Sequence, residues 1–458
     1  MQTLNLEALK GSVRGPIVLP ENPDYEQTRK LYNAMIDKRP AIIVRCNDVA
    51  DVIAALKFGK DQGLDIAIRG AGHNGGGLGS VDGGLMLDLS LMRGVRIDPE
   101  SKTGTAQGGC QLGDYDHAAH AFGLATPAGI ISTTGVGGLT LGGGIGHLTR
   151  KYGLTIDNLL SVDMVLADGS FVTANADHNK ELFWAVRGGG GNFGVVTSFT
   201  FKLYPVDTVI AGPTFWPIED AAEVLRWYRE FLPSAPEDLN GFFAFLTVPP
   251  VAPFPQELWQ KKVAAVVWCY LGSQEEADKL LSPVRRVGNL AMYGLGKVPY
   301  PALQSTFDAL YPPGHQWYWR ADFVKEISDA AIEKHVSNGN RLPTPQSTMH
   351  LYPIDGAASR ISNIETPWAY RDGKWAQVIV GVDPDPSKAQ SLKEWAVSYW
   401  EDLHPYSMGG AYVNFMMDEG QERVQATYRG NYARLAKVKA RYDQSNLFHV
   451  NQNIKPSA

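Results

Sequence analysis

Clusters of glycine are the feature that most constrains how this chain folds. The first cluster occupies residues 69–77, the second residues 135–146 and the third residues 187–194. Glycine loses more conformational entropy on folding than other residues, so such runs indicate a structural need. One need is a backbone whose N–H groups converge on an anion, and another is a backbone that lies against a flat ligand. A long ligand with a central diphosphate would use both. Flexible surface loops are the alternative, but apolar strand-like segments flank these runs.

Composition limits the classes of function. A chain of 458 residues with 44% hydrophobic residues is globular and too long for one core, so we expect two domains. A net charge of −6 without a basic block argues against nucleic-acid or membrane binding. The first residues lack the pattern of a secretory signal, and no segment is apolar over enough residues to span a bilayer, so a cytoplasmic location is expected.

The cysteine pattern predicts neither a metal site nor a disulfide framework. The three cysteines, Cys46, Cys110 and Cys269, are widely spaced and odd in number. We expect each to be a small buried hydrophobic residue.

The segment before residue 206 is predicted to alternate between strands and helices. Asn47 or Asp48 caps a helix over Val49–Gln62, and Gly63 ends it. The strand Asp65–Arg69 then leads directly into the first glycine cluster. The other expected helices are Leu4–Leu9, Tyr25–Ile36, Leu112–Phe122 and Lys180–Val186. The other expected strands are Pro16–Leu19, Ala41–Arg45, Leu85–Leu89, Gly94–Asp98, Thr103–Gln107, Ser161–Leu166, Phe171–Thr173 and Val195–Leu203.

The composition changes over residues 208–410, where aromatic strands alternate with helices. This pattern predicts an antiparallel sheet with helices on one face. The expected helices are Ile218–Phe231, Gln274–Val284 and Ser387–Tyr399, and the strands are Gly241–Val248, Ala264–Leu271, Thr348–Tyr352 and Val378–Val382. The last segment is expected to form a strand at Ala411–Phe415 and helices over Glu419–Tyr428 and Tyr432–Tyr442.

An ordered set of motifs resembles a known family. The set comprises the glycine loop with His73, the run G-x-G-G-x-x-x-G-G-G-x-G from Gly135, the segments 150–158, 184–188 and 192–196, and the closing Asn451-Gln452-Asn453-Ile454. Together they resemble the vanillyl-alcohol-oxidase-type, FAD-linked oxidases with a PCMH-type FAD domain. Within that family the chain is similar to the berberine-bridge-enzyme-like branch, over nearly its whole length and most weakly in the middle.

The resemblance implies an α+β fold with three parts. Residues 1–206 would form an FAD domain of two small subdomains, and residues 207–410 a substrate domain with a large antiparallel sheet backed by helices. Residues 411–458 would return to the FAD domain.

The resemblance also implies a covalent cofactor. The histidine at the position of His73 carries a bond to the flavin in the family, and a neutral imidazole nitrogen supplies the needed nucleophile. Many members have a second bond from a cysteine that lies four residues before the G-x-G-G run. Ile131 occupies that position here. The chain therefore resembles single-bond members such as 6-hydroxy-D-nicotine oxidase.

Further cofactor contacts are expected around the two glycine clusters. Backbone N–H groups would hold the diphosphate. Asp157 and Asn158 would line the ribityl chain or the ring, Val195 and Val196 the adenine, and Asn451 and Asn453 the flavin. The full expected set is His73, Arg69, Gly70, Ala71, Gly72, Asn74, Thr133, Thr134, Gly135, Gly137, Gly138, Gly142, Gly143, Gly146, Tyr152, Gly153, Asp157, Asn158, Gly194, Val195, Val196, Asn451 and Asn453.

Flavin oxidation also needs a group that takes a proton from the substrate. Tyr412 is the first candidate, because the family often has an active-site tyrosine in a Tyr-x-Asn strand, with Asn414 on the same face. A tyrosine base at pH 7 would need a cationic neighbour, for which Arg320 and Lys455 are candidates. The other candidates for the pocket are His350 and Tyr352 on one strand, and Tyr318 and Arg320 on another.

The expected reaction is oxidation of an alcohol, hemiacetal or amine of a small molecule. Thr134 occupies a position that tunes oxygen access in plant relatives, so its small side chain favours O2 as acceptor and H2O2 as product. Oxidative cyclisation or dehydrogenation of an aromatic natural product, and a catalytically silent flavin-binding protein, are the alternatives. An aromatic set would suit flat or apolar rings: Phe242, Phe243, Phe245, Trp268, Trp317, Trp319 and Tyr352. The sequence sets neither the substrate nor the oligomeric state.

Overall fold

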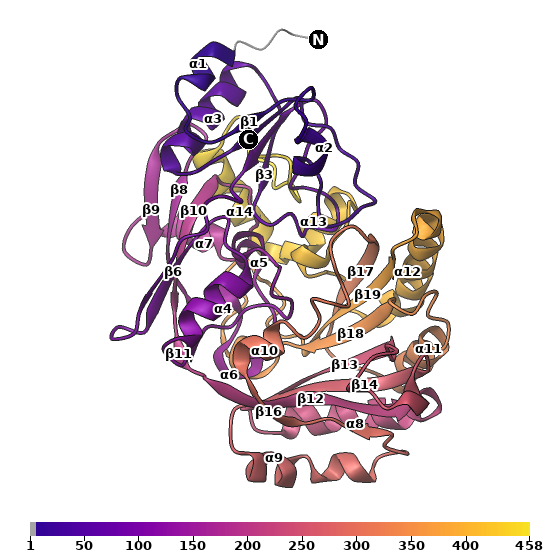
Figure 1. The fold of residues 1–458 in the computed structure, drawn as a ribbon. Helices are drawn as coiled ribbons and strands as arrows, with labels where there is room; N and C mark the ends of the chain where they lie inside the picture. Colours follow the sequence, from indigo (N-terminus) through magenta and orange to yellow (C-terminus); the bar gives the residue numbers. More distant parts are fainter. Residues whose placement is uncertain (1–5) are drawn as a thin grey trace.

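A computed structural model describes residues 6–458, which form three main sheets with helices between and around them (Figure 1). The first sheet has the order β1-β2-β4-β3, and its three longer strands run parallel. Its strands are β1 (Ile17–Val18), β2 (Ile42–Arg45), β3 (Ile66–Arg69) and β4 (Leu85–Asp88), and its helices are α1 (Leu6–Lys10), α2 (Tyr25–Thr28) and α3 (Val49–Asp61). The Asp48 side chain caps α3, and Gly63 follows its end at φ +64°, as expected from the sequence.

The second sheet is antiparallel, with the order β5-β6-β10-β8-β9. Its strands are β5 (Val95–Asp98), β6 (Thr103–Gln107), β8 (Leu159–Val165), β9 (Phe171–Asn175) and β10 (Val195–Lys202). Around it lie α4 (Leu112–His120), α5 (Val136–Gly142), α6 (Thr149–Tyr152), α7 (Lys180–Val186) and the small pair β7 (Leu124–Ala125) and β11 (Tyr204–Pro205). The glycine-rich loops therefore emerge between two sheets that both have apolar cores.

The third sheet is an antiparallel sheet of eight strands. Its strands are β12 (Thr208–Pro217), β13 (Leu239–Thr247), β14 (Lys262–Tyr270), β15 (Met292–Tyr293), β16 (Gly296–Pro299), β17 (Gln316–Val324), β18 (Thr348–Pro353) and β19 (Trp375–Asp383). Its helices are α8 (Ala221–Ser234), α9 (Gln274–Leu280), α10 (Tyr300–Gln304), α11 (Asp329–Gly339) and α12 (Ala389–Leu403). The helices α8, α11 and α12 lie on the side away from the first two sheets (Figure 1). This confirms the expected α+β fold with a helix-backed antiparallel sheet.

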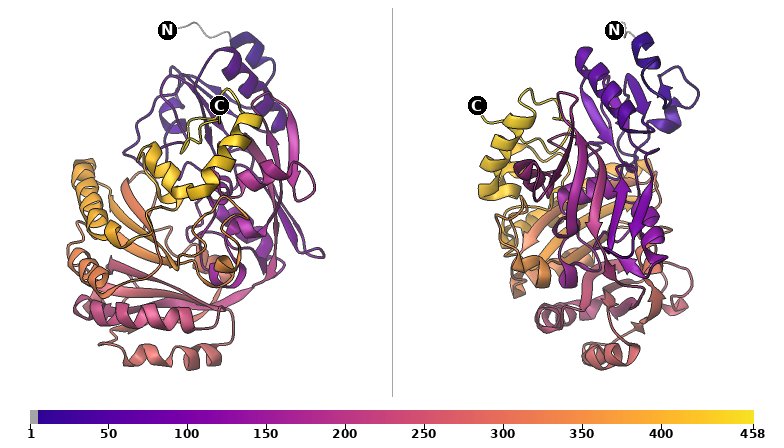
Figure 2. Two further views of the ribbon diagram at one scale, coloured as in Figure 1. Left: turned by 180° about the vertical axis from the view of Figure 1, so that it is seen from behind. Right: turned by 90° about the vertical axis from the view of Figure 1, so that its left-hand side faces the viewer.

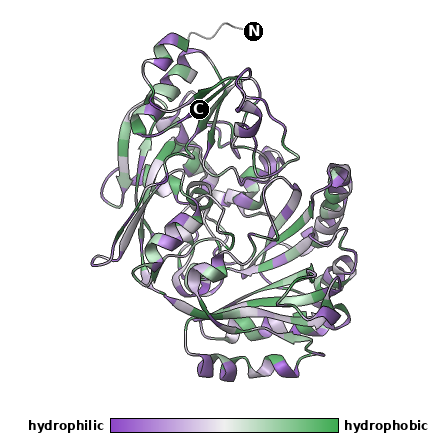
Figure 3. Ribbon diagram, viewed as in Figure 1, coloured by the Kyte–Doolittle hydropathy of each residue, from purple (hydrophilic) through white to green (hydrophobic). Residues whose placement is uncertain are grey.

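Hydropathy follows this layering. Figure 3 shows hydrophobic residues along the strands of the third sheet and hydrophilic residues over α9, which faces outward. No helix within residues 6–458 is both long and apolar enough to cross a membrane.

The last segment packs on helix α7 beside the second sheet and also contacts strand β17 of the third sheet. Its helices are α13 (Gln421–Tyr428) and α14 (Tyr432–Tyr442), and α14 packs on α7 (Figure 2). Lys439 is fully buried there and donates to Asp443, to the Asn192 carbonyl and to the Phe448 carbonyl. This buried ion pair fastens the C-terminal segment to the loop of the third glycine cluster.

Two expected elements are wrong. The helix over Tyr25–Ile36 stops at Thr28, because Arg69 donates to the main-chain oxygens of Thr28 and Lys30 and Asn33 bonds to Gly75 and Trp317. The strand at Ala411–Phe415 is instead a short 3₁₀ turn over Val413–Phe415. The expected helix over Leu4–Leu9 lies partly outside the described residues, and its described part belongs to α1.

Candidate active site

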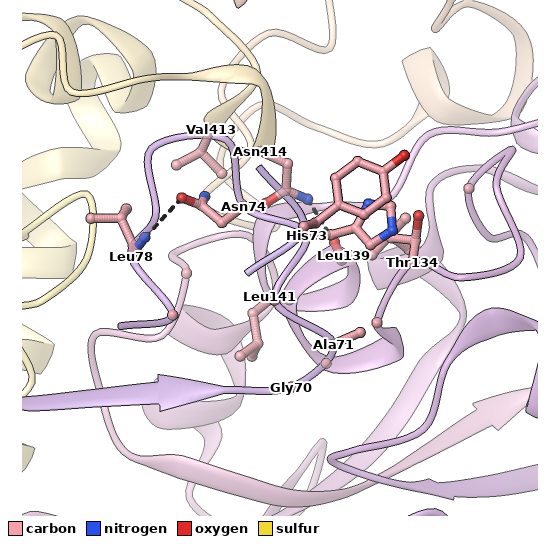
Figure 4. A pocket seen from close by; sticks show the side chains of 18 of the residues that line it. Gly70, Ala71, His73, Asn74, Leu78, Thr134, Leu139, Leu141, Val413 and Asn414 are labelled. Carbon is pink, nitrogen blue, oxygen red and sulfur yellow. Dashed lines mark hydrogen bonds between the residues drawn. The ribbon is translucent and has the colours of Figure 1, made fainter. Parts of the chain in front are cut away.

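A cavity of about 330 Å³ lies between the glycine loops and the third sheet. We call it the central cavity. Its wall combines the first two glycine clusters, strands β17, β18 and β19, the turn around Tyr412 and the C-terminal residues 450–452. Figure 4 shows that Gly70, Ala71, His73 and Asn74 share this wall with Thr134 and Asn414, which come from distant parts of the chain. The fold thus brings together three segments that are far apart in the sequence.

The loop after β3 offers free main-chain donors to the cavity. Within residues 6–458, the N–H groups from Gly70 through Gly76 donate to no protein acceptor. A run of N–H groups without protein acceptors beside a cavity indicates a site for an anion or another acceptor. Gly72 has a positive φ of +73°, which helps the loop to turn its N–H groups to one side. Gly70, Ala71, Gly72 and Asn74 all line the cavity.

The second glycine cluster forms the opposite side of this cradle. Helix α5 begins at Val136, so the N–H groups of Gly137 and Gly138 lie in its first turn and lack intrahelical acceptors. Gly135 lies so close to the first loop that a Cβ there would stand 2.9 Å from the Ala71 nitrogen. Glycine at this position lets the two loops meet.

His73 lies in the cavity wall as a neutral, oriented imidazole. Its burial lowers its pKa to about 3. Its Nε2 lies 3.0 Å from Thr133 Oγ1, with which it shares a hydrogen bond. The ring stacks on Tyr32 with centroids 3.8 Å apart, and Tyr32 in turn bonds to the Tyr311 carbonyl. Thr133 therefore contacts His73 without lining the cavity itself.

The third sheet presents alternate residues to the cavity. Trp317 and Trp319 on β17, Thr348, His350 and Tyr352 on β18, and Val378 and Val380 on β19 face it. The alternation is the one that a strand imposes. Tyr318 faces the helix-covered core, and Arg320 pairs with Glu419 at 2.6 Å, so our expectation that these two face the pocket is wrong. Phe243, Phe245 and Trp268 also lie in the helix-covered core, and Phe242 packs behind His350 and Tyr352.

His350 and Tyr352 form a hydrogen-bonded pair in the cavity wall. His350 Nδ1 lies 2.6 Å from the Tyr352 hydroxyl. Burial lowers the pKa of His350 to about 3 and raises the pKa of Tyr352, so both are neutral near pH 7. We call the two residues the His350–Tyr352 pair.

Tyr412 and Asn414 form a second polar group. The Tyr412 oxygen accepts from the Gly144 N–H at 2.8 Å and from Asn414 Nδ2 at 2.6 Å. Burial raises the pKa of Tyr412 more than these donors lower it. The cationic neighbour expected for it is not found among Arg320, which pairs with Glu419, and Lys455, which is exposed. Tyr412 is therefore a neutral phenol whose remaining hydrogen-bonding capacity is its own O–H.

Several other expected residues also line the cavity. Arg69 does so, but its guanidinium bonds to Asp88 at 2.6 Å, so its charge is already paired. Gly194 and Val196 also line the cavity, as do Ile66 and Ile68 of β3. Asn451 lines the wall and donates through Nδ2 to the Gly191 carbonyl. Ile131 lines the cavity, whereas Cys110 is buried and does not line it.

Three glycines that we expected at the cofactor lie outside the cavity wall. Close packing of protein segments explains why each of these residues is glycine. A Cβ on Gly142 would lie 2.0 Å from Asn414 Oδ1, and one on Gly146 would lie 1.8 Å from the Ala128 carbonyl oxygen. Gly143 has φ +137° and touches Trp368. These glycines let protein segments approach one another, so their expected contact with a cofactor is not seen.

The segment Tyr152–Asn158 also lies away from the cavity, contrary to expectation. Tyr152 stacks on Tyr204, and Gly153 turns at φ +84° against Asp157. Asp157 is paired bidentately with Arg371, at 2.7 Å for each contact, and Asn158 donates to the Tyr152 and Leu154 carbonyls. These groups are fully used in holding the local turn.

Two more expected contacts fall outside the wall. Val195 belongs to the core beneath the first sheet, because its side chain points opposite to that of Val196. Asn453 does not line the cavity, and its carbonyl accepts from Gln421.

Sequence reasoning missed residues that the fold adds to the wall. They are Tyr32, Ile130, Gly190, Gly191, Asn192, Phe307, Tyr311, Val378, Val380 and Gln452, among others. Tyr32 was assigned to a helix, and Phe307 and Tyr311 lie in a segment without a clear pattern. The third glycine cluster is a sequence signal that could have placed Gly190 and Gly191 in the cavity wall.

Comparison with known proteins agrees with this geometry. The FAD binding domain family matches residues 40–175, and the berberine and berberine-like family matches residues 411–455. An FAD-linked oxidoreductase of Dictyostelium discoideum is 32% identical over 97% of this chain and 95% of its own. The chain belongs to the FAD-linked oxidoreductases.

Two further proteins are similar to this chain. The (R)-6-hydroxynicotine oxidase of Paenarthrobacter nicotinovorans is 28% identical, with 97% of each chain covered. The solved structure of a variant of berberine-bridge-enzyme-like 1 from Physcomitrella patens has a TM-score of 0.89, covers both chains fully and is 24% identical, which shows a shared fold. The free N–H groups of the glycine cradle and the cavity beside them fit FAD, with a diphosphate at the cradle.

Proposed function

We propose that this FAD-linked oxidoreductase is an oxidase that acts on a C–H bond next to an alcohol, hemiacetal or amine of a small molecule. O2 would be the electron acceptor and H2O2 the second product. The observation that carries the proposal is the continuity of the central cavity, which runs from the glycine cradle to the inner face of the third sheet. A cofactor at the cradle and a substrate against the sheet would therefore be in contact. Bound FAD supplies the chemistry of hydride acceptance and of electron transfer to O2.

The main chain of the glycine cradle would hold the cofactor's diphosphate. The free N–H groups from Gly70 through Gly76 and those of Gly137 and Gly138 supply positive partial charge without a lysine. Gly194 and Val196 line the cavity and would contact the adenine. Asn451, from the C-terminal segment, would contact the cofactor from another side.

We further propose one covalent bond, between His73 and the flavin. Burial lowers the pKa of His73 to about 3, so a nitrogen lone pair remains available near pH 7. The Thr133 hydrogen bond engages Nε2 and leaves Nδ1 free within residues 6–458. The stacked Tyr32 ring fixes the plane of the imidazole. These contacts support a nucleophile that is oriented before the cofactor arrives. Ile131 cannot form the second bond.

Tyr412 would serve as a hydrogen-bond donor rather than as the proton acceptor. Both lone pairs of its oxygen accept hydrogen bonds, from Gly144 and Asn414. Such an oxygen can orient a substrate or cofactor oxygen through its O–H, but it has no lone pair ready for a further proton. Asn414 would keep this orientation through its second contact, to the Leu139 carbonyl at 3.0 Å.

Thr134 supports the choice of O2. It lines the central cavity close to the cradle, and its small side chain leaves room for a diatomic molecule. The assay is to reduce the enzyme anaerobically with a substrate, mix it with air-saturated buffer, and measure H2O2 together with the flavin spectrum. We expect one H2O2 per substrate consumed and rapid return of oxidised flavin. A reduced flavin that persists in air but is reoxidised by a quinone would make the protein a dehydrogenase.

A further inference from the structure

The inner face of the third sheet carries aromatic side chains around the His350–Tyr352 pair. We call this part of the central cavity the aromatic chamber. Its walls are Phe307, Tyr311, Trp317, Trp319, Tyr352, Val378, Val380 and Phe415. Phe415 joins the two polar groups, with its ring 5.8 Å from that of Tyr352 and 4.7 Å from that of Tyr412. A substrate between the pair and the cofactor would lie against these rings.

The chamber has no ionised side chain. Of the cavity-lining residues that the structure describes, Arg69 alone carries a charge, and it is paired with Asp88 at the cradle end. His73 and His350 are neutral because burial lowers the pKa of each to about 3. A charged substrate would leave water without gaining a counter-ion, and that penalty is large in an apolar site.

The chamber also has few hydrogen-bonding groups. Thr348 Oγ1 already donates to the Phe245 carbonyl, and the main chain of Trp317 is bonded to Asn33. The Tyr311 carbonyl accepts from Tyr32, which leaves the Tyr311 hydroxyl, the unpartnered indole N–H groups of Trp317 and Trp319, and the His350–Tyr352 pair as the polar side-chain groups of these walls. Because an indole N–H only donates, a substrate with many hydroxyls would find few acceptors for its O–H groups.

The His350–Tyr352 pair matches a single hydroxyl. One of its two groups donates to the other, and either tautomer leaves one donor and one acceptor free. The O–H of an alcohol can donate to the free acceptor of the pair, and its oxygen can accept from the free donor. The pair can also take up a proton, because the Tyr352 oxygen can receive one while its own proton passes 2.6 Å to His350 Nδ1.

We propose that the substrate is an uncharged, largely apolar alcohol whose hydroxyl is bound and deprotonated by the His350–Tyr352 pair. This inference rests on the proposed oxidase function and adds the substrate class and a catalytic pair. The alcohol carbon loses its hydrogen and two electrons to FAD, the hydroxyl proton passes to the pair, and a carbonyl forms. O2 then takes the two electrons and two protons to give H2O2. The proton held by His350 balances the negative charge that hydride transfer adds to the cofactor, in a cavity without another counter-ion.

The test compares alcohols of the same shape and different charge. The probes are 4-tert-butylbenzyl alcohol, its isostere 4-(trimethylammonio)benzyl alcohol, 4-(hydroxymethyl)benzoate and cellobiose, each mixed anaerobically with the flavin-bearing holoenzyme. We expect the neutral alcohol to exceed the charged isosteres and the sugar at least about a hundredfold in the rate constant of flavin reduction divided by the dissociation constant. Equal or faster reduction by a charged probe or by cellobiose, or no reduction by the neutral alcohol, overturns the substrate class.

Two variants test the pair. Tyr352→Phe should lower the flavin reduction rate at least about a hundredfold while the flavin spectrum stays that of the wild type. Tyr318→Phe makes the same chemical change on the helix-covered face of the sheet and should leave the rate unchanged. His350→Gln should retain binding of the neutral alcohol, measured by the perturbed flavin absorbance, but lose the fast reduction. Near-wild-type reduction in Tyr352→Phe contradicts the assignment. A purified wild-type protein without flavin would instead refute the proposed function, before any substrate is added.

Discussion

His147 provides a quantitative test of how burial acts on the histidines of this protein. Its side chain is 3% exposed, its ring is tilted against Phe242, and its Nε2 has no hydrogen-bond partner among the described residues. Burial lowers its pKa to about 3 from an ordinary value of 6.5. Below pH 6.5 the unfolded chain binds a proton at His147 that the folded protein does not bind. The contribution of neutral His147 to the free energy of unfolding is therefore complete above pH 6.5 and is lost as the pH falls toward 3.

The magnitude follows from the two pKa values. At pH 5.5, one unit below the unfolded pKa, a histidine that stays neutral in the folded state lowers the free energy of unfolding by about 1.4 kcal/mol relative to pH 8. His147→Leu removes this group without removing a hydrogen bond of Nε2. We expect the difference in unfolding free energy between pH 8.0 and pH 5.5 to be smaller by about 1.4 kcal/mol in the variant.

Urea unfolding at the two pH values, followed by tryptophan fluorescence, measures this difference for wild type and variant. Taking the change between pH values cancels any effect of the substitution on packing. His117→Leu is the control, because it replaces a histidine that is exposed on α4. An unchanged pH dependence in His147→Leu would refute the reasoning, and would imply that His147 is protonated in the folded protein.

Three further predictions concern other parts of the site. Asp157→Ala leaves the buried Arg371 without its bidentate partner, so the free energy of unfolding should fall by about 3–5 kcal/mol. The flavin absorbance should stay normal. Loss of the flavin would mean that Asp157 contacts the cofactor. Thr134→Leu should slow reoxidation by O2 and leave anaerobic reduction nearly unchanged, as two separate stopped-flow measurements would show; equal slowing of both would mean that Thr134 positions substrate or cofactor. Tyr412→Phe leaves the Gly144 N–H and one Asn414 N–H unpaired, so the free energy of unfolding, measured in urea, should fall by about 1–3 kcal/mol for each donor. The rate of flavin reduction should fall less than in Tyr352→Phe. A larger loss of rate in Tyr412→Phe would return the role of proton acceptor to Tyr412.

The sequence predicted the cradle well because its signal is local. A strand that ends in a glycine loop, and a second glycine run that begins a helix, are visible without tertiary information. At other positions, glycine led to wrong predictions of cofactor contact. Gly146 is glycine because the Ala128 carbonyl leaves no room for a Cβ, whereas Gly72 turns a loop along the cavity. A glycine that lets two protein segments approach closely looks the same in a sequence as a glycine that lets a ligand approach.

The remaining errors have equally physical causes. Alternation along β17 separates Trp317 and Trp319 from Tyr318 and Arg320, but it does not say which set faces the cavity, because both faces of this sheet are covered. The helical pattern after Tyr25 was overridden by long-range hydrogen bonds from Asn33 and Arg69. The family resemblance predicts a cofactor contact for Asp157, and the sequence does not show that this carboxylate is already paired, because its partner Arg371 lies far away in the chain.

The most direct test of the account is the mass of the intact protein after denaturation in acid. We expect the wild-type chain to carry the added mass of one FAD, and digestion to place it on the peptide that contains His73. His73→Ala should have the mass of the bare polypeptide, and Thr133→Val should show partial occupancy because Nε2 loses its hydrogen bond. A wild-type chain that is loaded with flavin in its native state but has the bare mass in acid would contradict the covalent bond, and a flavin on any other peptide would contradict the role of His73.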